Sequence, residues 1–432
     1  MTLSTQPYKG TRDFYPEDYR LQKYIFETWR KSVESFGYEQ YDAPLLEPLD
    51  LYLAKSGQEI VTEQTYEFTD RGGRRVAIRP EMTPTIARMV AARRQELPYP
   101  YRVYSIPNLW RYERPQRGRL REHWQLNVDL FGVDNIQAEL EIISVADDIM
   151  QRFGAKRSMY KILISSRKLV NYFLREVIGF DETQTQSAIK LIDRMHKMDA
   201  ATFAGLLDGI MQSAQREAGK HDELMKFLRA KSPAEMPESI KSSEHYTQVI
   251  QLLDQLGIAN AEFDPTLMRG FDYYTDVVFE VMDTDSQNNR SLFGGGRYDG
   301  LVGLFGAEPV PTIGFGMGDV ALGVFLQSHD LVPNLDAHTE VYVVVVGDVA
   351  KEAQKVVSSM RKEGLRIAVD ISGKKIDKQL KAADKHNVKW VMFIGEQELE
   401  DEQFGIKNLR TGNNEKHSVE RLVSIIKDKR NN

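Results

Sequence analysis

The stretch from Trp110 to Gly132, WRYERPQRGRLREHWQLNVDLFG, constrains the fold most strongly, because it reads as two β-strands joined by a basic loop. Along the second arm, apolar side chains alternate with the polar side chains of His123, Gln125, Asn127 and Asp129. This period of two predicts a strand with one apolar and one polar face. A buried strand seldom carries so many polar groups unless a ligand satisfies them. The polar face is therefore predicted to form the floor of a site for a small polar ligand.

The first arm and the loop of this hairpin predict a site for anions. Arg111 and Glu113 lie two residues apart on the first arm, so they would share one face. The loop adds four guanidinium groups, which suit phosphate, at Arg114, Arg117, Arg119 and Arg121. The alternative is a solvated hairpin with a charged tip, and both interpretations stay open on this stretch alone.

The order of strand and helix patterns predicts an α+β chain with more than one domain. Residues 1–326 contain most of the sheet-forming segments, interrupted at 168–261 by a helical, charge-rich insertion. A linker is expected over 327–338, where Pro333 and Asn334 occur. The continuous apolar run VYVVVV then opens a segment, 339–432, in which strands alternate with helices. Such a run suits a strand buried on both faces, so this segment is predicted to be a small α/β domain.

Composition narrows the classes of function. The 432 residues include no cysteine, which excludes disulfides and thiolate metal sites and is compatible with a reducing cytoplasm. No signal peptide and no membrane-spanning run are expected. The net charge is −6, so contact with nucleic acid would need local basic patches. The Lys-rich segment GKKIDKQLKAADKH could be such a patch or simply a solvated helix face.

Three shorter segments carry further expectations. A helix is predicted to begin after Pro80 and run to about Arg94, with Thr83 or Thr85 as its N-cap; Glu81, just before it, could bind an ammonium group or only complement the helix terminus. Pro44 interrupts a short strand, which fits either an edge strand or a dimer interface. Glycines at 294–296 would let the backbone approach a ligand closely, although no Walker A pattern is present.

Several motifs together resemble those of one enzyme family. They are KGTRDFYPED near the start, WRYERPQRGR in the hairpin, LMRGFDYYTDVVFE, GGGRYDGLV and GFGMGDVAL. Over essentially its full length the chain resembles the histidyl-tRNA synthetase family of class II aminoacyl-tRNA synthetases, whose dimer-interface motif the segment around Pro44 also resembles. The resemblance implies a class II antiparallel catalytic sheet with a helical insertion, a C-terminal α/β anticodon-binding domain and a cytoplasmic homodimer.

The same resemblance implies that the substrates are histidine, ATP and histidine tRNA, with Mg²⁺ accompanying ATP and no metal bound tightly by the protein. Arg111 would contact the α-phosphate and Arg119 the terminal phosphates, with Glu113 also at the ATP site. Arg269, from RGFDYY, would stabilise the α-phosphate from the opposite side, where other class II enzymes commonly use a metal ion. His123 or Trp124 could stack on adenine, although the apolar parity of Trp124 favours a core role.

Histidine recognition is likewise assigned by resemblance. Asp129 and Tyr274 would read the imidazole ring. The ammonium group would be held by Glu81, Thr83 and Gln125. The pocket would be lined by Tyr273 and Tyr298. On the loop, Gln116 and Arg121 are candidates for contact with the acceptor end of tRNA, with a solvated loop as the alternative.

Two positions depart from the family pattern. Many members have glutamate where this chain has Asp129, and the third motif usually ends with an arginine where this chain has Ala321. The loss of that arginine leaves open how the γ-phosphate is held. It also leaves open a histidine-sensing regulatory paralogue of ATP phosphoribosyltransferase, or an RNA-binding protein without catalysis. The presence of the C-terminal segment, and of Arg111 together with Arg269, favours the active enzyme.

Overall fold

The computed structural model describes residues 3–53, 64–268, 273–285 and 291–428, and it divides the chain into two compact units. Unit 1 spans Met1–Val332 and unit 2 spans Pro333–Asn432. None of the helices within the described ranges combines the length and apolar character that a membrane span requires. The predicted α+β class is confirmed, with a largely antiparallel sheet in unit 1 and a mixed sheet in unit 2.

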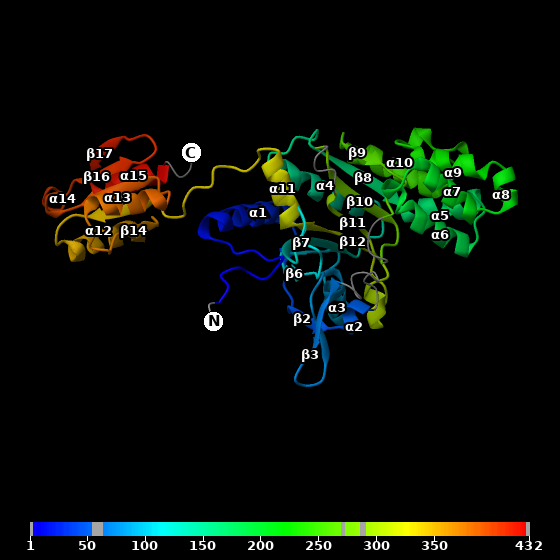
Figure 1. Ribbon diagram of the computed structural model, residues 1–432, viewed down its shortest axis with the longest axis horizontal. Coiled ribbons are helices and arrows are strands. Elements are labelled where there is room, and N and C mark those ends of the chain that lie inside the picture. Colours follow the sequence, from blue (N-terminus) through cyan, green and yellow to red (C-terminus); the bar gives the residue numbers. More distant parts are fainter. Residues whose placement is uncertain (1–2, 54–63, 269–272, 286–290, 429–432) are drawn as a thin grey trace. The chain divides into compact units, whose positions relative to one another are not determined.

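A large sheet organises unit 1 (Figure 1). Its neighbouring strands are, in order, β1 (Glu39–Gln40), β5 (Tyr101–Ser105), β7 (Glu122–Phe131), β12 (Thr312–Gly318), β11 (Ser291–Arg297), β10 (Val277–Asp283), β8 (Tyr160–Ser166) and β9 (Ala261–Phe263). A short strand, β6 (Asn108–Trp110), pairs with the start of β7. Pairing is antiparallel except at the two outer pairs, β1 with β5 and β8 with β9. The edge strands are β1 and β9, and Pro44 lies between β1 and β2, outside both strands.

Helices pack on the apolar face of this sheet. They are α1 (Pro16–Ser35), α4 (Gln137–Arg152), α10 (Glu244–Leu256) and α11 (Asp319–Ser328). The first of them begins with Pro16, Glu17 and Asp18, and a proline and acidic residues favour a helix N-terminus. Its Trp29 and Val33 are fully buried in the core beside Leu126 and Val128 of β7. The core therefore takes one face of the sheet and leaves the opposite face for polar side chains.

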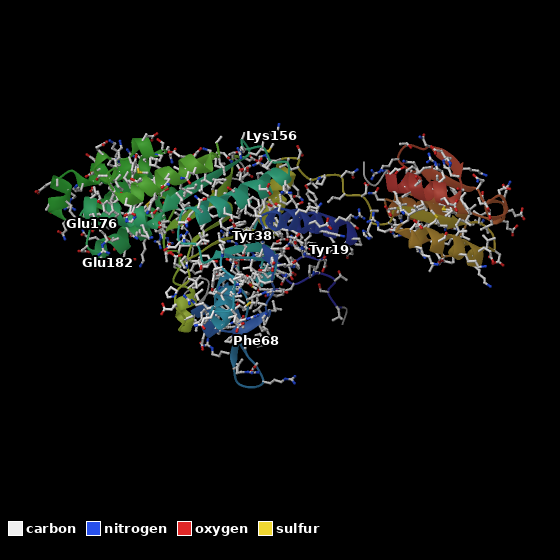
Figure 2. All side chains as sticks on the ribbon, turned by 180° about the vertical axis from the view of Figure 1, so that it is seen from behind. Tyr19, Tyr38, Phe68, Lys156, Glu176 and Glu182 are labelled. Carbon is white, nitrogen blue, oxygen red and sulfur yellow. The ribbon has the colours of Figure 1, made fainter. Side chains whose placement is uncertain are left out.

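A smaller sheet with two helices adjoins the large one. It contains β2 (Leu46–Pro48), β4 (Arg75–Ile78) and β3 (Tyr66–Thr69), with α2 (Asp50–Leu53) and α3 (Thr83–Arg93) nearby. The β3–β4 hairpin extends away from the large sheet and carries the exposed Phe68 (Figure 2). The helix expected after Pro80 is confirmed, but the predicted caps are wrong, because its N-cap is Met82 and no side chain caps it. Thr83 is already the first residue of α3, where its hydroxyl cannot act as the N-cap.

Between β8 and β9 the chain forms a helical bundle with its own core. The bundle contains α5 (Arg167–Tyr172), the π-helical turn η2 (Phe173–Val177), α6 (Glu182–Ile192), α7 (Ala200–Ile210), α8 (Ser213–Glu217) and α9 (Lys220–Arg229), followed by α10. Asp181 opens α6 with a capping box closed by Gln184, which explains why a helix begins there. Short 3₁₀ turns connect the helices at Met195–Lys197, Pro233–Glu235 and Glu238–Ile240.

Unit 2 is a five-stranded sheet covered by helices. The strands are, in order, β14 (Ile367–Val369), β13 (Val341–Val345), β15 (Trp390–Ile394), β16 (Phe404–Asn408) and β17 (Asn414–His417). The helices are α12 (Ala350–Lys362), α13 (Ile376–Lys385), α14 (Glu396–Asp401) and α15 (Val419–Asp428). The apolar run forms β13, which pairs in parallel with a strand on each side, and its Val343 and Val344 are fully buried. The expectation of a strand buried on both faces is thus confirmed.

Candidate active site

Glycines of β12, the strand paired with β7, leave room for the polar side chains of β7 that were predicted to form the floor of the site. In the register of β7 with β12, Asn127 pairs with Gly316 and Asp129 with Gly314. A Cβ at Gly314 would lie 2.5 Å from Oδ1 of Asp129, and a Cβ at Gly316 would lie 2.9 Å from the side-chain amide of Gln125. The side chains of Asp129 and Gln125 can therefore lie across β12 only because β12 has no side chains at Gly314 and Gly316. These glycines are absent from the residues predicted for the site, although the alternation G-x-G-x-G at 314–318 is visible in the sequence.

The glycines at 294–296 in β11 are needed for a reason different from the predicted approach of a ligand. A Cβ at Gly294 would lie 2.6 Å from the carbonyl oxygen of Phe279, and one at Gly296 would lie 2.6 Å from that of Val277. A Cβ at Gly295 would collide with the carbonyl oxygen of Gly314. Close approach of the neighbouring strands, rather than of a ligand, is sufficient to require glycine here.

One end of the floor holds a buried cluster of carboxyl and phenol groups. The hydroxyl of Tyr298 donates to Oδ1 of Asp129, and the hydroxyl of Tyr273 donates over 3.1 Å to Oε2 of Glu81. Tyr274 completes the cluster, with its ring centroid 5.0 Å from that of Tyr273 and 6.4 Å from that of Tyr298. Three separate parts of the chain therefore meet at this point, namely the segment before α3, strand β7 and the strands β10 and β11 with their flanks.

Burial tunes the protonation of this cluster. It raises the pKa of Asp129 to about 7, and the hydrogen bond from Tyr298 opposes this rise only in part. Burial, and then the charge of Asp129, holds the pKa of Tyr298 well above its ordinary value, so the phenol stays a donor. Within the described part of the chain, the buried Oδ2 of Asp129 has no hydrogen-bond partner. This orphaned acceptor can bind the N–H group of a ligand.

Thr83 lies at the same cluster, and Gln125 lies further along the polar face of β7. A hydrogen bond from Thr83 partly opposes the rise in the pKa of Tyr273 that burial causes, which places the threonine hydroxyl beside that phenol. Gln125 is half-buried on β7, two residues before Asn127, whose amide donates to the carbonyl of Gln125. The structure thus brings together six of the seven residues predicted for histidine: Glu81, Thr83, Asp129, Tyr273, Tyr274 and Tyr298. The seventh, Gln125, lies on the same face of β7, four residues before Asp129.

The other end of the floor is positively charged. Asp129 and His123 are six residues apart on β7, a distance of about 20 Å at about 3.3 Å per residue. Arg111 donates from Nε to the carbonyl of Pro80 over 2.8 Å, which fixes the direction of its guanidinium group. Burial, and then the charges of Arg111 and Arg12, lower the pKa of His123 to about 3. His123 is therefore a neutral ring at physiological pH, suited to packing on a flat group rather than to pairing with phosphate.

The loop differs from its prediction in two ways. The first strand, β6, ends at Trp110, so Arg111 and Glu113 follow it instead of lying on it as predicted, since the backbone turns where the amide of Glu113 donates to the carbonyl of Arg111. Arg121 is buried, with its guanidinium 4.0 Å from the ring of Tyr112 and donating to the hydroxyl of Tyr8 over 2.9 Å. This packing favours a structural role for Arg121 over the predicted contact with tRNA.

The remaining loop residues stay accessible. Gln116 and Arg119 exchange backbone hydrogen bonds and close a tight turn at the tip. The side chain of Arg119 is 53% exposed, with Nη1 of its guanidinium 3.8 Å from the carboxylate of Glu113. Trp124 packs edge-on against Phe14 at 5.5 Å, in agreement with the preferred core role. Arg269, the predicted cation on the opposite side, lies outside the described residues.

Comparisons with known proteins agree with this geometry. The family model for histidyl-tRNA synthetase matches residues 10–320, and a model for an anticodon binding domain matches residues 340–429. A histidine–tRNA ligase of Leptospira biflexa is 43% identical over 99% of this chain and 98% of its own length. One of Thermoplasma volcanium is 37% identical over 97% of both chains.

Two solved structures are similar in fold. The crystal structure of histidyl-tRNA synthetase from Nostoc sp. PCC 7120 aligns with a TM-score of 0.84 and 22% identity, over 99% of this chain and 100% of that one. An ATP phosphoribosyltransferase regulatory subunit/histidyl-tRNA synthetase from Bacillus halodurans aligns with a TM-score of 0.74 and 23% identity, over 91% of this chain and 99% of that one.

Proposed function

The chain belongs to the histidyl-tRNA synthetase family, and we propose that its glycine-floored site performs both half-reactions of a histidine–tRNA ligase. In the first, a carboxylate oxygen of histidine attacks the α-phosphorus of ATP, and pyrophosphate leaves. In the second, a hydroxyl of the terminal ribose of histidine tRNA attacks the acyl carbon, and AMP leaves. The observation that carries the proposal is the buried Asp129–Tyr298 pair, which has an orphaned oxygen on the same floor as Arg111.

The acidic end of the floor would select the amino acid. Oδ2 of Asp129 would accept a hydrogen bond from the imidazole, and Tyr274 would read the ring from its other side. Glu81, together with Thr83 and Gln125, would hold the ammonium group. An amino acid without the imidazole N–H would leave Asp129 buried and unpaired, which is costly, so the cluster suits strong discrimination.

The cationic end would hold ATP. Negative charge spreads over the phosphate oxygens as the α-phosphate is attacked, and fixed cations aimed at that charge stabilise the transition state. Arg111, whose guanidinium is oriented by the carbonyl of Pro80, would contact the α-phosphate, and the exposed Arg119 would contact the terminal phosphates. Mg²⁺ usually binds phosphates together with one or two protein carboxylates, a role that Glu113 fits. His123 would pack on adenine, and Arg269 would face the α-phosphate as the family resemblance implies.

The division of labour along the chain is also a proposal. Residues 1–326 would form the catalytic domain with its insertion at 168–261, a linker would span 327–338, and 339–432 would bind the anticodon. The chain would form a homodimer, as the family resemblance implies. The expected setting is the cytoplasm. The regulatory paralogue is not favoured, because full-length histidine–tRNA ligases are the curated relatives at 43% and 37% identity.

The decisive experiment is histidine-dependent exchange between ATP and pyrophosphate, followed by charging of histidine tRNA. Exchange with histidine, and none with phenylalanine or glutamine, is the expected result. A protein that binds histidine but supports no exchange at saturating ATP would instead be the regulatory paralogue.

Gly314→Ala should damage the histidine end of the site. The new Cβ would meet Oδ1 of Asp129 and the carbonyl oxygen of Val128, each at 2.5 Å, so the acidic side chain must move. We expect the KM for histidine to rise by about 10-fold or more and stability to fall by about 1–3 kcal/mol. Steady-state exchange and urea unfolding measure the two effects.

The matched control is Gly323→Ala on α11, where a Cβ meets nothing within 4 Å. This change should stabilise the helix by about 0.5–1 kcal/mol and leave the KM for histidine unaltered. A Gly314→Ala enzyme with normal histidine kinetics would show that histidine binding does not require glycine at position 314 of β12.

Removal of unit 2, by ending the chain at Val332, should weaken tRNA charging far more than exchange. Each unit has its own hydrophobic core, so unit 1 is expected to keep its fold. We expect exchange to stay within about threefold of the full chain, while kcat/KM for tRNA falls by about 100-fold or more, as for the loss of several charged contacts. Equal loss of both activities would contradict a separate tRNA-recognition module.

A further inference from the structure

An N-terminal strap, residues 8–14, crosses the base of the hairpin (Figure 1). The carbonyl of Gly10 accepts hydrogen bonds from the amides of Arg121 at 2.9 Å and Glu122 at 3.3 Å. Gly10 has a φ of +86°, and a Cβ there would lie 2.8 Å from Cγ of Arg121, so only glycine lets the strap lie this close. Further along, Phe14 packs on Trp124. The strap thus follows the first residues of β7.

Arg12 lies between these two anchors. One terminal nitrogen of its guanidinium donates to Oδ2 of Asp319 over 2.7 Å, and the group lies 4.7 Å from the ring of Phe14. Arg12, like Arg111, lowers the pKa of His123, for which burial is the larger cause, so both guanidinium groups lie near that imidazole. The Nε atom of Arg12 is buried without a hydrogen-bond partner among the described residues, and the side chain remains 30% exposed.

Asp319 holds Arg12 at the N-terminal end of α11. It is the first residue of α11 and is 3% exposed, and its other oxygen accepts from the amide of Trp124 over 2.9 Å. Two residues later comes Ala321, at the position where the family usually has its third-motif arginine. The strap therefore places the guanidinium group of Arg12 at the start of α11, the helix in which Ala321 stands where the family usually has arginine.

We propose that Arg12 contacts the phosphates of ATP in place of the missing arginine at position 321. The proposal rests on the proposed histidine–tRNA ligase function. Asp319 engages one of the five donors of the guanidinium, and its planar fork can bind a second anion along another edge. The competing interpretation is an ion pair that only ties the strap to α11. Substitutions on the two sides of the pair separate these roles.

The test measures the KM for ATP and for histidine in pyrophosphate exchange with the full chain. Arg12→Gln removes the charge but keeps an amide that can donate to Asp319. It should raise the KM for ATP by about 10- to 100-fold, typical of a lost charged hydrogen bond, and leave the KM for histidine within about twofold. Asp319→Asn keeps the guanidinium but leaves one acceptor oxygen for the two donors, Arg12 and the Trp124 amide, so the KM for ATP should change much less than in Arg12→Gln.

Two further variants sharpen the result. Arg102→Ala is the matched control, because Arg102 is 31% exposed and pairs with Glu141 through two hydrogen bonds of 2.8 Å on the helix side of the sheet. It should leave the KM for ATP unchanged. In the double variant R12Q/A321R, the arginine restored at position 321 should recover most of the lost ATP affinity.

The proposal is overturned if Arg12→Gln leaves the KM for ATP within twofold, or if Asp319→Asn raises it as much as Arg12→Gln does. Should Arg12→Gln not fold by circular dichroism, R12A/D319N removes both charges and leaves no unpaired buried carboxylate, and a KM for ATP within twofold in this double variant would equally overturn it. Absence of exchange in the unaltered protein would instead refute the proposed function.

Discussion

Asp129→Asn is expected to lower kcat/KM for histidine by about 100- to 1,000-fold, with little change in the KM for ATP. The carboxyl group has one oxygen bound by Tyr298 and the other orphaned and buried. In the variant, the amide oxygen would still accept from Tyr298, and the NH₂ group would then point a donor at the N–H of the imidazole. Two donors cannot hydrogen-bond to each other, so the site would reject the ring that it is built to accept. Pyrophosphate exchange at varied histidine concentrations measures the effect.

Asp147→Asn is the matched control for this substitution. Asp147 is also a buried carboxyl group that accepts from a tyrosine hydroxyl, that of Tyr160 over 2.5 Å, but it lies on α4 behind the sheet. Its loss should reduce stability without altering histidine kinetics. If the two variants behave alike, Asp129 stabilises the fold and does not select the substrate.

Asp129 should also make the stability of the free protein depend on pH. Its folded pKa, about 7, lies above the unfolded value of about 3.9, so between these pH values the folded state binds more protons. Stability contributed by the protonated group is full below about pH 4 and is lost as the pH rises through 7. Asp129→Asn should remove this part of the decline, which urea unfolding at pH 5 and pH 8 would detect.

Arg111→Ala is expected to lower kcat for exchange by about 100- to 1,000-fold while the dissociation constant for histidine changes little. The guanidinium is oriented by the carbonyl of Pro80, the residue directly before Glu81. The same short segment therefore positions the cation for the α-phosphate and the carboxylate for the ammonium group. Single-turnover formation of the adenylate separates the chemical step from binding.

Arg114→Ala serves as the control, because Arg114 is an exposed arginine of the same loop. Loss of one loop charge should then affect exchange by no more than about threefold. A comparable loss in both variants would mean that the loop acts through its total charge, and that Arg111 has no special position.

The sequence predicted the polar face of β7 because its period of two is local. The clearance at Gly314 and Gly316 could not be predicted in the same way, because it depends on the register between strands almost 190 residues apart in the chain. Arg121 was expected on an exposed loop because nothing nearby in the sequence indicates that Tyr8 covers it. Long-range pairing, rather than local propensity, decides these positions.

The alternation of strands and helices in residues 339–432 was sufficient to predict the α/β class of unit 2. The final antiparallel pair, β16 with β17, was not foreseen, since its short strands resemble loop sequence. The resemblance supplied the residue roles at the site. It assigned no role to Arg12, which emerges only from the contact of Arg12 with Asp319.

The ion pair between Arg12 and Asp319 also sets an order of events during synthesis. The two residues are 307 positions apart. At about 5–20 residues per second, the strap would leave the ribosome roughly 15–60 s before its anchor exists. During that interval Phe14 can already pack on Trp124, but Arg12 lacks its carboxylate partner, so a nascent chain that stops short of α11 cannot complete the nucleotide end of the site. Translation pauses or truncations before residue 319 should therefore yield chains in which the N-terminal strap is held at Gly10 and Phe14 but not at Arg12.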